Sequence, residues 1–319
     1  MLGTALDAVV PDPRRGHPVA VFGTAASRLE QRIWADSRPR GAVFTAICVG
    51  AAVQAGRLVE RRAGRFRPAA IAAGTWAVLG ARSLRVEGRA VHDRLAADDL
   101  AAAREQVTHL VGRDPSVLDT DGVARAALES IAENTCDAIV APLMWGAVAG
   151  LPGLLGYRAV NTLDAMVGHR SPRYARFGWA SARLDDLANL APARATALLI
   201  ALAAPAVGGD TRTTLRIAVR DGGKHPSPNS GVSEAAYAGA LGLRLGGRNV
   251  YASRVEERPL LGDGARPRTA DLRRATRLCA AVTVVAGPVV AAIAGVVVPA
   301  TVARFRAVVP EWCRCSEDR

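Results

Sequence analysis

The sequence predicts an all-α, polytopic membrane fold with four or five membrane-embedded segments and helical polar loops. Half of the residues are hydrophobic, yet only 4% are aromatic. No alternating strand pattern of any length is present. Five long stretches carry no charged residue: 41–56, 68–81, 138–157, 195–209 and 278–303. We therefore expect one membrane-embedded domain over residues 1–319, inserted as a multi-pass protein of the cell membrane.

The length of each uncharged stretch decides whether it can cross a bilayer. A spanning helix needs about 20 residues. Stretch 278–303 is long enough, and 138–157 is just long enough. The other three are shorter, so they span with the help of flanking arginines that reach the interface, or they are buried core helices.

The charge pattern favours a membrane over a nucleic acid as the partner of this basic chain. The formal net charge is +12. Five arginines lie between the first two apolar stretches, where the positive-inside rule places them on the cytoplasmic side: Arg57, Arg61, Arg62, Arg65 and Arg67. No basic stripe with interleaved aromatic residues is present, which excludes the usual nucleic-acid surface. The five cysteines show no metal-binding or disulfide spacing.

The polar segments predict helices between recognisable breaks. A turn at residues 12–18 precedes a helix over 19–34, and residues 82–97 form another. Asp98 or Asp99 caps a helix that runs to Val111, and Gly112 to Pro115 ends it. Thr120 or Asp121 then caps a helix that continues into the run 138–157.

That last helix carries three carboxylates, Glu129, Glu133 and Asp137, with Asn134 beside them. Their spacing of four residues places them along one face, where like charges repel. A metal ion, a cationic substrate group or arginines from elsewhere would compensate. Because the face enters an apolar run, where an unpartnered charge is costly, we favour a functional site.

The run 138–157 is interrupted by prolines and glycines, so we expect it to kink or break. Broken membrane helices line cavities. Asp185 and Asp186 follow later, and because neighbours on a helix diverge by about 100°, they should serve different partners. A lone His169 is expected to be structural.

Lys224 is the only lysine, so 40 of the 41 basic residues are arginines. It lies in a loop at 221–231 rich in glycine and proline, which can wrap backbone N–H groups around an anion while the lysine supplies a point charge to phosphate. The alternative is an ordinary surface turn. A helix over 234–245 and a second glycine-rich turn at 246–251 follow.

Together these segments resemble the CobD/CbiB family of membrane-bound adenosylcobinamide-phosphate synthases. Six ordered blocks carry the resemblance: Asp12-Pro13 with His17-Pro18; Val111 to Asp114; Glu129 to Asn134 with Asp137 and Pro142-Leu143; Tyr157 to Asp164 with Gly168; Arg183 to Asp186 with Asn189; and Lys224 to Asn229. The family usually opens with a longer apolar helix before the Asp-Pro turn. Here about ten residues precede that turn, which implies a start further upstream or the absence of that helix.

The resemblance implies a reaction in cobalamin biosynthesis. Adenosylcobyric acid would be joined through its f propionate to aminopropanol, or to aminopropanol O-phosphate, as an amide. ATP would activate the carboxylate as an acyl phosphate. Other late membrane enzymes of the pathway are implied as partners, together with the lipid bilayer and the corrinoid.

The resemblance also implies site residues. Glu129, Glu133, Asp137 and Asp164 would hold Mg²⁺ or orient the amine, with the metal assigned to Glu133, Asp137 and Asp164. Lys224, Arg113 and His225 would bind phosphates, and Asp185 or Asp186 would act as the base. The remaining binding candidates are Asn134, Asn161, Arg183 and Asn229.

Two alternatives remain, a transporter and a non-catalytic scaffold of a membrane pathway. A transporter predicts inverted repeats, which the sequence lacks. A scaffold leaves the single lysine and the carboxylate face without a purpose. If all five stretches cross, the blocks fall on opposite sides of the bilayer. We therefore expect some blocks to dip into the membrane, or 138–157 to be re-entrant and 195–209 to stop short of crossing.

Overall fold

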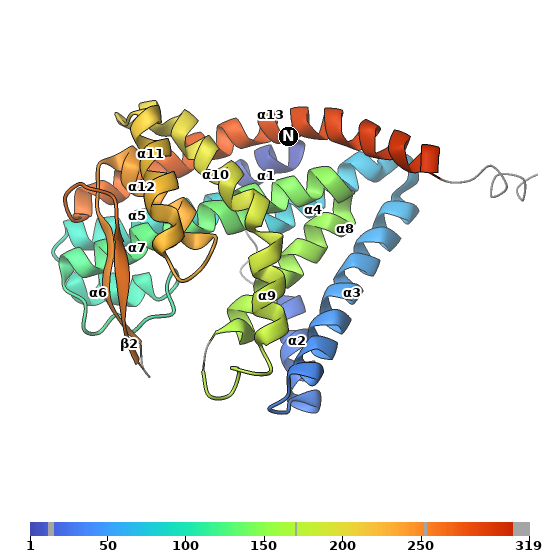
Figure 1. Ribbon diagram of the computed structural model, residues 1–319, viewed down its shortest axis with the longest axis horizontal. Helices are drawn as coiled ribbons and strands as arrows, with labels where there is room; N and C mark the ends of the chain where they lie inside the picture. The colour runs from blue at the N-terminus through green and yellow to red at the C-terminus, as the bar shows by residue number, and fades with distance from the viewer. Residues whose placement is uncertain (12–15, 170, 252–253, 309–319) are drawn as a thin grey trace, which may run out of the picture.

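The computed structural model describes residues 1–11, 16–169, 171–251 and 254–308, which form helices and one two-stranded sheet joined by turns and loops (Figure 1). The helices are α1 (Leu2–Val9), α2 (Pro18–Ile33), α3 (Arg38–Ala63), α4 (Arg67–Val78), α5 (Ala81–Ala96), α6 (Leu100–Val107), α7 (Thr120–Thr135), α8 (Ala141–Leu163), α9 (Trp179–Ala188), α10 (Leu190–Ala203), α11 (Thr211–Asp221), α12 (Ser230–Leu241) and α13 (Thr269–Val308). The strands are β1 (Leu245–Tyr251) and β2 (Arg254–Leu261).

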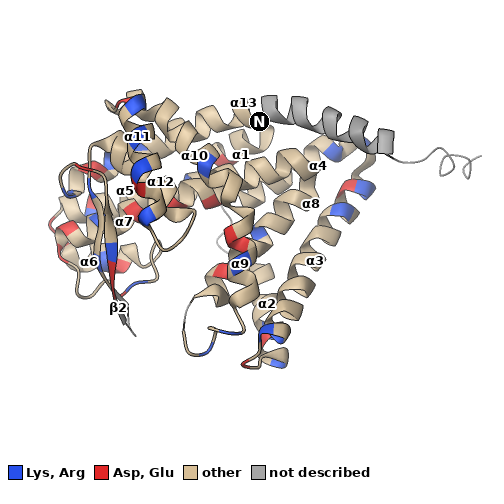
Figure 2. Cartoon of the chain, in the orientation of Figure 1, with Lys and Arg blue, Asp and Glu red and all other residues tan. Residues whose placement is uncertain are grey.

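Two regions of the molecule differ in composition. α3 and α8 pack together and are almost free of charged residues except at the ends of the helices. At the opposite end of the molecule, α5, α6, α7 and the hairpin formed by β1 and β2 carry charges of both signs (Figure 2). The largest buried core lies within the charged end, where α13 packs against α5, α7 and α10. The apolar end is suited to lipid and the charged end to water.

Three helical stretches among the described residues are long and apolar enough to cross a membrane: Arg38–Ala96, Thr120–Gly168 and Leu190–Val207. They contain the predicted stretches 41–56, 68–81 and 138–157 and most of 195–209. Stretch 278–303 lies within α13. The predicted class, a helical membrane protein, is therefore confirmed.

The predicted break in the run 138–157 is also confirmed. α8 leaves helical geometry at Gly150, whose φ of 64° and ψ of −147° suit glycine. Asn161 Nδ2 donates to Asp137 Oδ2 at 3.3 Å although the two residues are 24 positions apart. A straight helix would separate them by about 36 Å. The chain therefore reverses at Gly150 and returns to the side where the run began.

A neighbouring helix supports this reversal. The Leu151 amide, next to the break, donates to Glu60 Oε1 of α3 at 3.0 Å. A Cβ on Gly56 of the same helix would lie 2.7 Å from Pro152 Cα. The backbones of α3 and α8 thus approach too closely for a larger residue, which explains the use of small residues in these apolar stretches.

The hairpin corrects the prediction that the sequence contains no strand. Residues 246–251 form most of β1 instead of a turn, and β1 pairs antiparallel with β2, with Asn249 opposite Glu256. Gly246 and Gly247 have φ of 89° and 92°, and the register shifts between Leu245 and Gly247. Glycines and a bulge interrupt the alternating pattern by which a strand is predicted.

Three helix boundaries differ from the prediction. The N-cap of α7 is Asp119, whose Oδ1 accepts from the Gly122 amide at 2.7 Å, in place of Thr120 or Asp121. Asp99 caps α6, which ends at Val107 before the predicted Val111. α12 begins and ends earlier than the predicted 234–245, directly after the lysine loop. The Asp12-Pro13 turn, Cys313 and Cys315 lie outside the described residues.

Candidate active site

A network of paired charges links α7 to β1. Arg113 Nη2 donates to Glu129 Oε2 at 2.5 Å, and both side chains are buried. Arg113 also donates to Asn249 Oδ1 on β1. The Gly246 amide donates to Glu129 Oε1 at 2.9 Å. Both oxygens of Glu129 are therefore used in holding the hairpin against α7.

The network continues through His225 at the end of the lysine loop. Arg258 Nη1 donates to His225 Nε2 at 2.8 Å, and His225 Nε2 lies 3.8 Å from Glu234 Oε1. Burial, followed by the Arg258 guanidinium, lowers the pKa of His225. Because a guanidinium is always protonated, Nε2 is the acceptor and the imidazole is neutral. Burial raises the pKa of Glu234 well above its usual value, and the nearby Glu129 and Glu133 raise it further.

Lys224 lies one residue before this buried histidine but points to a more open place. Its Nζ donates to Asp221 Oδ1 at 2.7 Å, and its side chain is 49% exposed. Asp221 is buried and also accepts from Arg220 and from the Gly262 amide at 2.8 Å. Hydrogen bonding from Arg220 holds the pKa of Asp221 well below its usual range. The ionised Asp221 carboxylate therefore holds the Lys224 ammonium group in place, and the ammonium group remains accessible to a ligand.

A cavity of about 120 Å³ lies beside this network. Its lining includes Arg113, Glu129, Glu133, Glu234 and Arg258. Five side chains of both signs therefore surround one small space at the junction of α7, α12 and the hairpin.

Glu133 joins this paired network to a second cluster. Ser230 Oγ, at the start of α12, donates to Glu133 Oε1 at 2.7 Å. Ser230 is six residues after Lys224, so the lysine loop and the carboxylate helix meet directly. The carboxylate of Glu133 also interacts electrostatically with His225.

The second cluster contains five carboxylates that interact with one another: Glu133, Asp137, Asp164, Asp185 and Asp186. Asp137 lies in the π-helical turn Cys136–Val140, and Asp164 begins the π-helical turn Asp164–Gly168. Such turns widen a helix by one residue and occur often at functional sites. Here the two turns lie directly before and after α8, which doubles back at Gly150, and the carboxylate of each turn faces α9.

On α9, Asp185 is held in place by a chain of side-chain hydrogen bonds. Asn189 Nδ2 donates to Asp185 Oδ2 at 3.0 Å, and Tyr157 OH donates to Asn189 Oδ1 at 2.9 Å. Asp185 Oδ1 is buried and accepts no hydrogen bond from the residues that the structure describes. Burial raises the pKa of Asp185 to about 6. This carboxyl group can therefore exchange a proton near neutral pH.

Asp186 turns to different partners, as predicted. Its Oδ2 pairs with Arg183 at 3.4 Å, and its backbone oxygen accepts from Asn229 Nδ2 at 2.8 Å. Asn229 Oδ1 in turn accepts from Arg194 Nη1 at 2.8 Å. Asn229 thus joins the end of the lysine loop to α9 and α10.

The structure brings most of the predicted residues to one region. Glu133, Asp137, Asp164, Asp185, Asp186 and Asn161 form the acidic side, and Arg113, Glu129, His225 and Asn229 lie beside it. Three candidates are peripheral. Lys224 Nζ bonds to Asp221, and the lysine loop reaches the acidic side through Ser230 instead. Asn134 Nδ2 donates to Ser130 O of its own helix at 3.0 Å, and the Arg183 side chain is 62% exposed.

The expected conflict over sidedness does not arise. The reversal at Gly150 places Asp137 beside Asn161, and Asn229 contacts Asp186. The blocks before and after the runs 138–157 and 195–209 therefore meet on the same side.

The oxygen donors suit a hard cation such as Mg²⁺. Within the described residues, no three His, Cys, Asp or Glu side chains are arranged to hold a metal ion. The buried, unpartnered Asp185 Oδ1 is the oxygen best placed to accept a new ligand.

Sequence reasoning missed three participants: Arg258, Glu234 and Asn249. Asn189 stood in one of the resembling blocks but was given no role. Glu234 left a signal, because it is an acidic residue in an otherwise apolar, alanine-rich helix. Arg258 and Asn249 left none, since both lie on strands that the sequence pattern did not reveal.

Comparisons with known proteins agree with one another. The family model described as CobD/Cbib protein matches residues 1–279. A cobalamin biosynthesis protein CobD from Mycobacterium tuberculosis (strain ATCC 25618 / H37Rv) is 55% identical over 279 residues, covering 87% of this chain and 89% of that protein. Proteins of the same name from Rhodobacter capsulatus and Geobacter metallireducens are 47% and 45% identical, covering 83% and 85% of this chain and 85% and 88% of theirs. No solved structure matches the chain.

Proposed function

Because this chain belongs to the CobD/CbiB family, which acts in cobalamin biosynthesis, we propose that it is an ATP-dependent ligase of the cytoplasmic membrane. It joins aminopropanol, or its O-phosphate, to the f propionate of cobyric acid or its adenosyl form. The observation that carries this proposal is the meeting of an accessible ammonium loop with a five-carboxylate cluster at Glu133.

The reaction needs an activated carboxylate, because a free carboxylate is a poor acyl donor. An oxygen of the propionate attacks the γ-phosphorus of ATP, which releases ADP and gives an acyl phosphate. The amine then attacks the acyl carbon, and phosphate leaves. Phosphoryl transfer depends mostly on positioning and on cations around the phosphate oxygens. Lys224, half exposed and fixed by Asp221, supplies such a cation.

The acidic cluster suits the amine step. An amine is protonated at neutral pH and must lose a proton before it attacks. Asp185 or Asp186 takes that proton, and the pKa of about 6 of Asp185 fits a group that accepts a proton near neutrality. Asn189 and Tyr157 hold Asp185 in place for this role.

In this proposal Glu133, Asp137 and Asp164 would supply oxygen ligands for Mg²⁺ after their side chains move together, because they are not arranged to hold a metal ion in the part of the chain that the structure describes. Bound there, the metal would neutralise phosphate charge. It would also relieve the repulsion among the carboxylates, whose convergence from α7, α8 and α9 is otherwise unfavourable.

The test uses the purified full chain in detergent with cobyric acid, aminopropanol phosphate and Mg-ATP. A ligase releases ADP and an amidated corrinoid in equal amounts, and omission of Mg²⁺ abolishes both. Glu133→Gln is expected to lose both products. A transporter or a scaffold would release neither from the wild-type protein, and that result would reject the proposal.

A further inference from the structure

A second and larger cavity lies on the outer side of the hairpin, away from the carboxylate cluster. Its volume is about 500 Å³, within the usual range for small-molecule sites. Four arginines contribute to its lining: Arg125, Arg244, Arg248 and Arg266. We propose that this cavity, the arginine pocket, binds the phosphates of a nucleoside triphosphate.

The charge of the pocket supports an anionic ligand. The four arginines outnumber the two acidic residues of the lining, Asp119 and Asp121, so the pocket is positively charged. Asp119 is engaged as the N-cap of α7. Arg244, Arg248 and Arg266 form no ion pair with any residue that the structure describes. Such guanidinium groups are suited to bidentate binding of phosphate oxygens.

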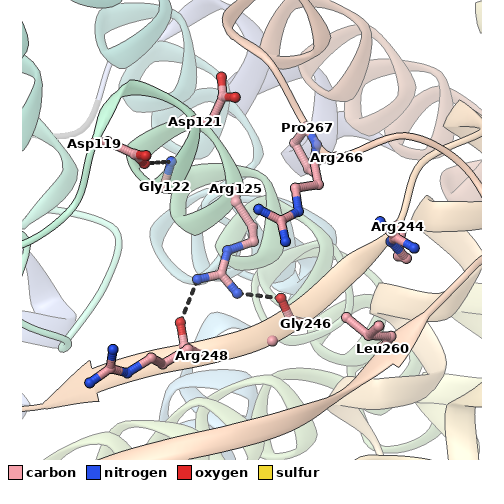
Figure 3. A pocket seen from close by; sticks show the side chains of 11 residues that line it. Asp119, Asp121, Gly122, Arg125, Arg244, Gly246, Arg248, Leu260, Arg266 and Pro267 are labelled. Carbon is pink, nitrogen blue, oxygen red and sulfur yellow. Dashed lines mark hydrogen bonds between the residues drawn. The ribbon is translucent and has the colours of Figure 1, made fainter.

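Arg125 is the fixed member of the set. It donates to the backbone oxygens of Gly246 and Arg248, the latter at 2.6 Å, and its side chain is only 16% exposed (Figure 3). Arg266 points into the same space above β1 and interacts electrostatically with Arg125 (Figure 3). Arg125 Nη1 also lies 3.8 Å from Glu129 Oε1, which offsets part of its charge, so an anion would bind mainly to Arg244, Arg248 and Arg266.

Glycine keeps the floor of the pocket open. Gly247 has a φ of 92°, and a Cβ there would lie 3.5 Å from Arg125 Nη1 and 3.9 Å from Leu260 Cδ2. A side chain at this position would therefore enter the space beside the arginines. Leu260, which is 51% exposed, offers an apolar surface at the same wall.

The position of the pocket favours a dissolved ligand over a lipid headgroup. The hairpin lies at the charged end of the molecule, opposite the apolar helix α3 (Figures 1 and 2). A triphosphate with an attached nucleoside matches both the arginines and the apolar wall.

The pocket is connected to the candidate active site through Gly246 and through Arg125, whose Nη1 lies 3.8 Å from Glu129 Oε1. Gly246 accepts from Arg125 on the pocket side, and its amide donates to Glu129 at 2.9 Å on the other. Strand β1 is thus the shared wall. This inference goes beyond the proposed function, because β1 separates a triphosphate bound here from Lys224 and the carboxylate cluster, where the reacting phosphates would lie.

The first experiment measures binding of inorganic tripolyphosphate to the full chain in neutral detergent by calorimetry. The variant Arg244→Gln/Arg266→Gln should bind more weakly by about tenfold for each arginine removed. The matched control, Arg212→Gln/Arg216→Gln, removes two exposed arginines from α11 and should bind like the wild type. Equal affinity of the pocket variant and the wild type, or an equal loss in the control, overturns the assignment. Unchanged thermal unfolding shows that the variants are folded.

A second experiment separates nucleotide from lipid. A non-hydrolysable ATP analogue should displace tripolyphosphate from the wild type. In nanodiscs, phosphatidylglycerol should leave tripolyphosphate binding as it is in phosphatidylcholine. Displacement by phosphatidylglycerol but not by the analogue would assign the pocket to a lipid headgroup and overturn the proposal.

The binding assay contains no corrinoid and no amine, so its result does not depend on turnover. Loss of ligation with intact tripolyphosphate binding would reject the proposed function and leave the pocket. An active enzyme whose pocket variant binds tripolyphosphate as tightly as the wild type does would reject the pocket and leave the function.

Discussion

The paired network around Glu129 and the acidic cluster around Asp185 lie side by side but use charge in opposite ways. Arg113 and the Gly246 amide satisfy Glu129 on both oxygens. In the acidic cluster, five carboxylates repel one another although Arg183 pairs with Asp186, and one oxygen of Asp185 is buried without a hydrogen bond within the described residues.

This difference separates a structural arrangement from a functional one. Paired buried charges fix the hairpin against α7 in the absence of any ligand. Converging like charges destabilise the folded protein and are relieved only when a cation or a proton arrives. Sites of this kind exchange stability for activity. The two regions should therefore respond to mutation with opposite signs.

Breaking the paired network should give the largest effect on stability. Arg113→Leu removes the closer counter-charge of the buried Glu129 and leaves Arg125 at 3.8 Å, so we expect a loss of about 3 kcal/mol in the free energy of unfolding. Thermal or denaturant unfolding in detergent measures it. The double variant Arg113→Leu/Glu129→Gln also removes the charge of Glu129 and keeps an acceptor for Gly246, so it should recover part of the loss. Equal stability of the single variant and the wild type would contradict the assigned role.

Lys224→Arg should give the next largest effect, on turnover instead of stability. The guanidinium can retain the contact with Asp221 but places its charge over a larger plane, so we expect about a 100-fold loss of ADP release. The melting temperature should stay unchanged, because the side chain is half exposed. Arg216→Lys on α11 is the matched control, with wild-type activity expected. Full activity of Lys224→Arg would remove any special role for the ammonium.

Neutralising the acidic cluster should raise stability in a pH-dependent way. The pKa of Asp185 is about 6 in the folded protein, against 3.8 for an ordinary aspartate, so the folded state binds this proton more tightly. Its contribution to stability is present below pH 3.8 and is lost as the pH rises through about 6. The melting temperature of Asp185→Asn should therefore exceed that of the wild type by a margin that grows as the pH rises from 3.8 to about 6. The same variant should lose ligation activity.

Asp263 provides a control of opposite sign for this measurement. Hydrogen bonding from Arg220 lowers the pKa of its carboxyl group, so its contribution is present at neutral pH and is lost on acidification. Asp263→Asn should thus melt below the wild type at neutral pH. Parallel pH profiles for Asp185→Asn and the wild type would show that the cluster carries no stored repulsion.

The smallest effect is expected where the two regions join. Ser230→Ala removes the hydrogen bond to Glu133, which should cost about 1 kcal/mol and reduce turnover several-fold. Thr24→Ala removes an exposed hydroxyl that bonds only to its own helix and should change nothing measurable. A Ser230→Ala variant that is indistinguishable from Thr24→Ala would mean that the two regions are not coupled through this contact.

Local sequence patterns predicted much of this molecule. Uncharged length predicted the apolar helices, and the glycines and prolines of 138–157 predicted the break that occurs at Gly150. The spacing of Glu129, Glu133 and Asp137 predicted a shared face, of which Glu133 and Asp137 joined the acidic cluster. Glu129 did not, because Arg113 from a preceding loop neutralises it. No pattern along the chain specifies that pairing.

The sequence by itself determined the helical membrane class and the residue types of the site, because helix period, charge-free length and backbone-breaking residues act over a few neighbouring positions. Tertiary structure alone decided that α8 turns back to place Asp137 beside Asn161, that a glycine-rich segment becomes β1, and that Ser230 brings the lysine loop to Glu133. Those contacts join residues far apart in the chain, and they form because the buried polar groups of one element can be satisfied only by another.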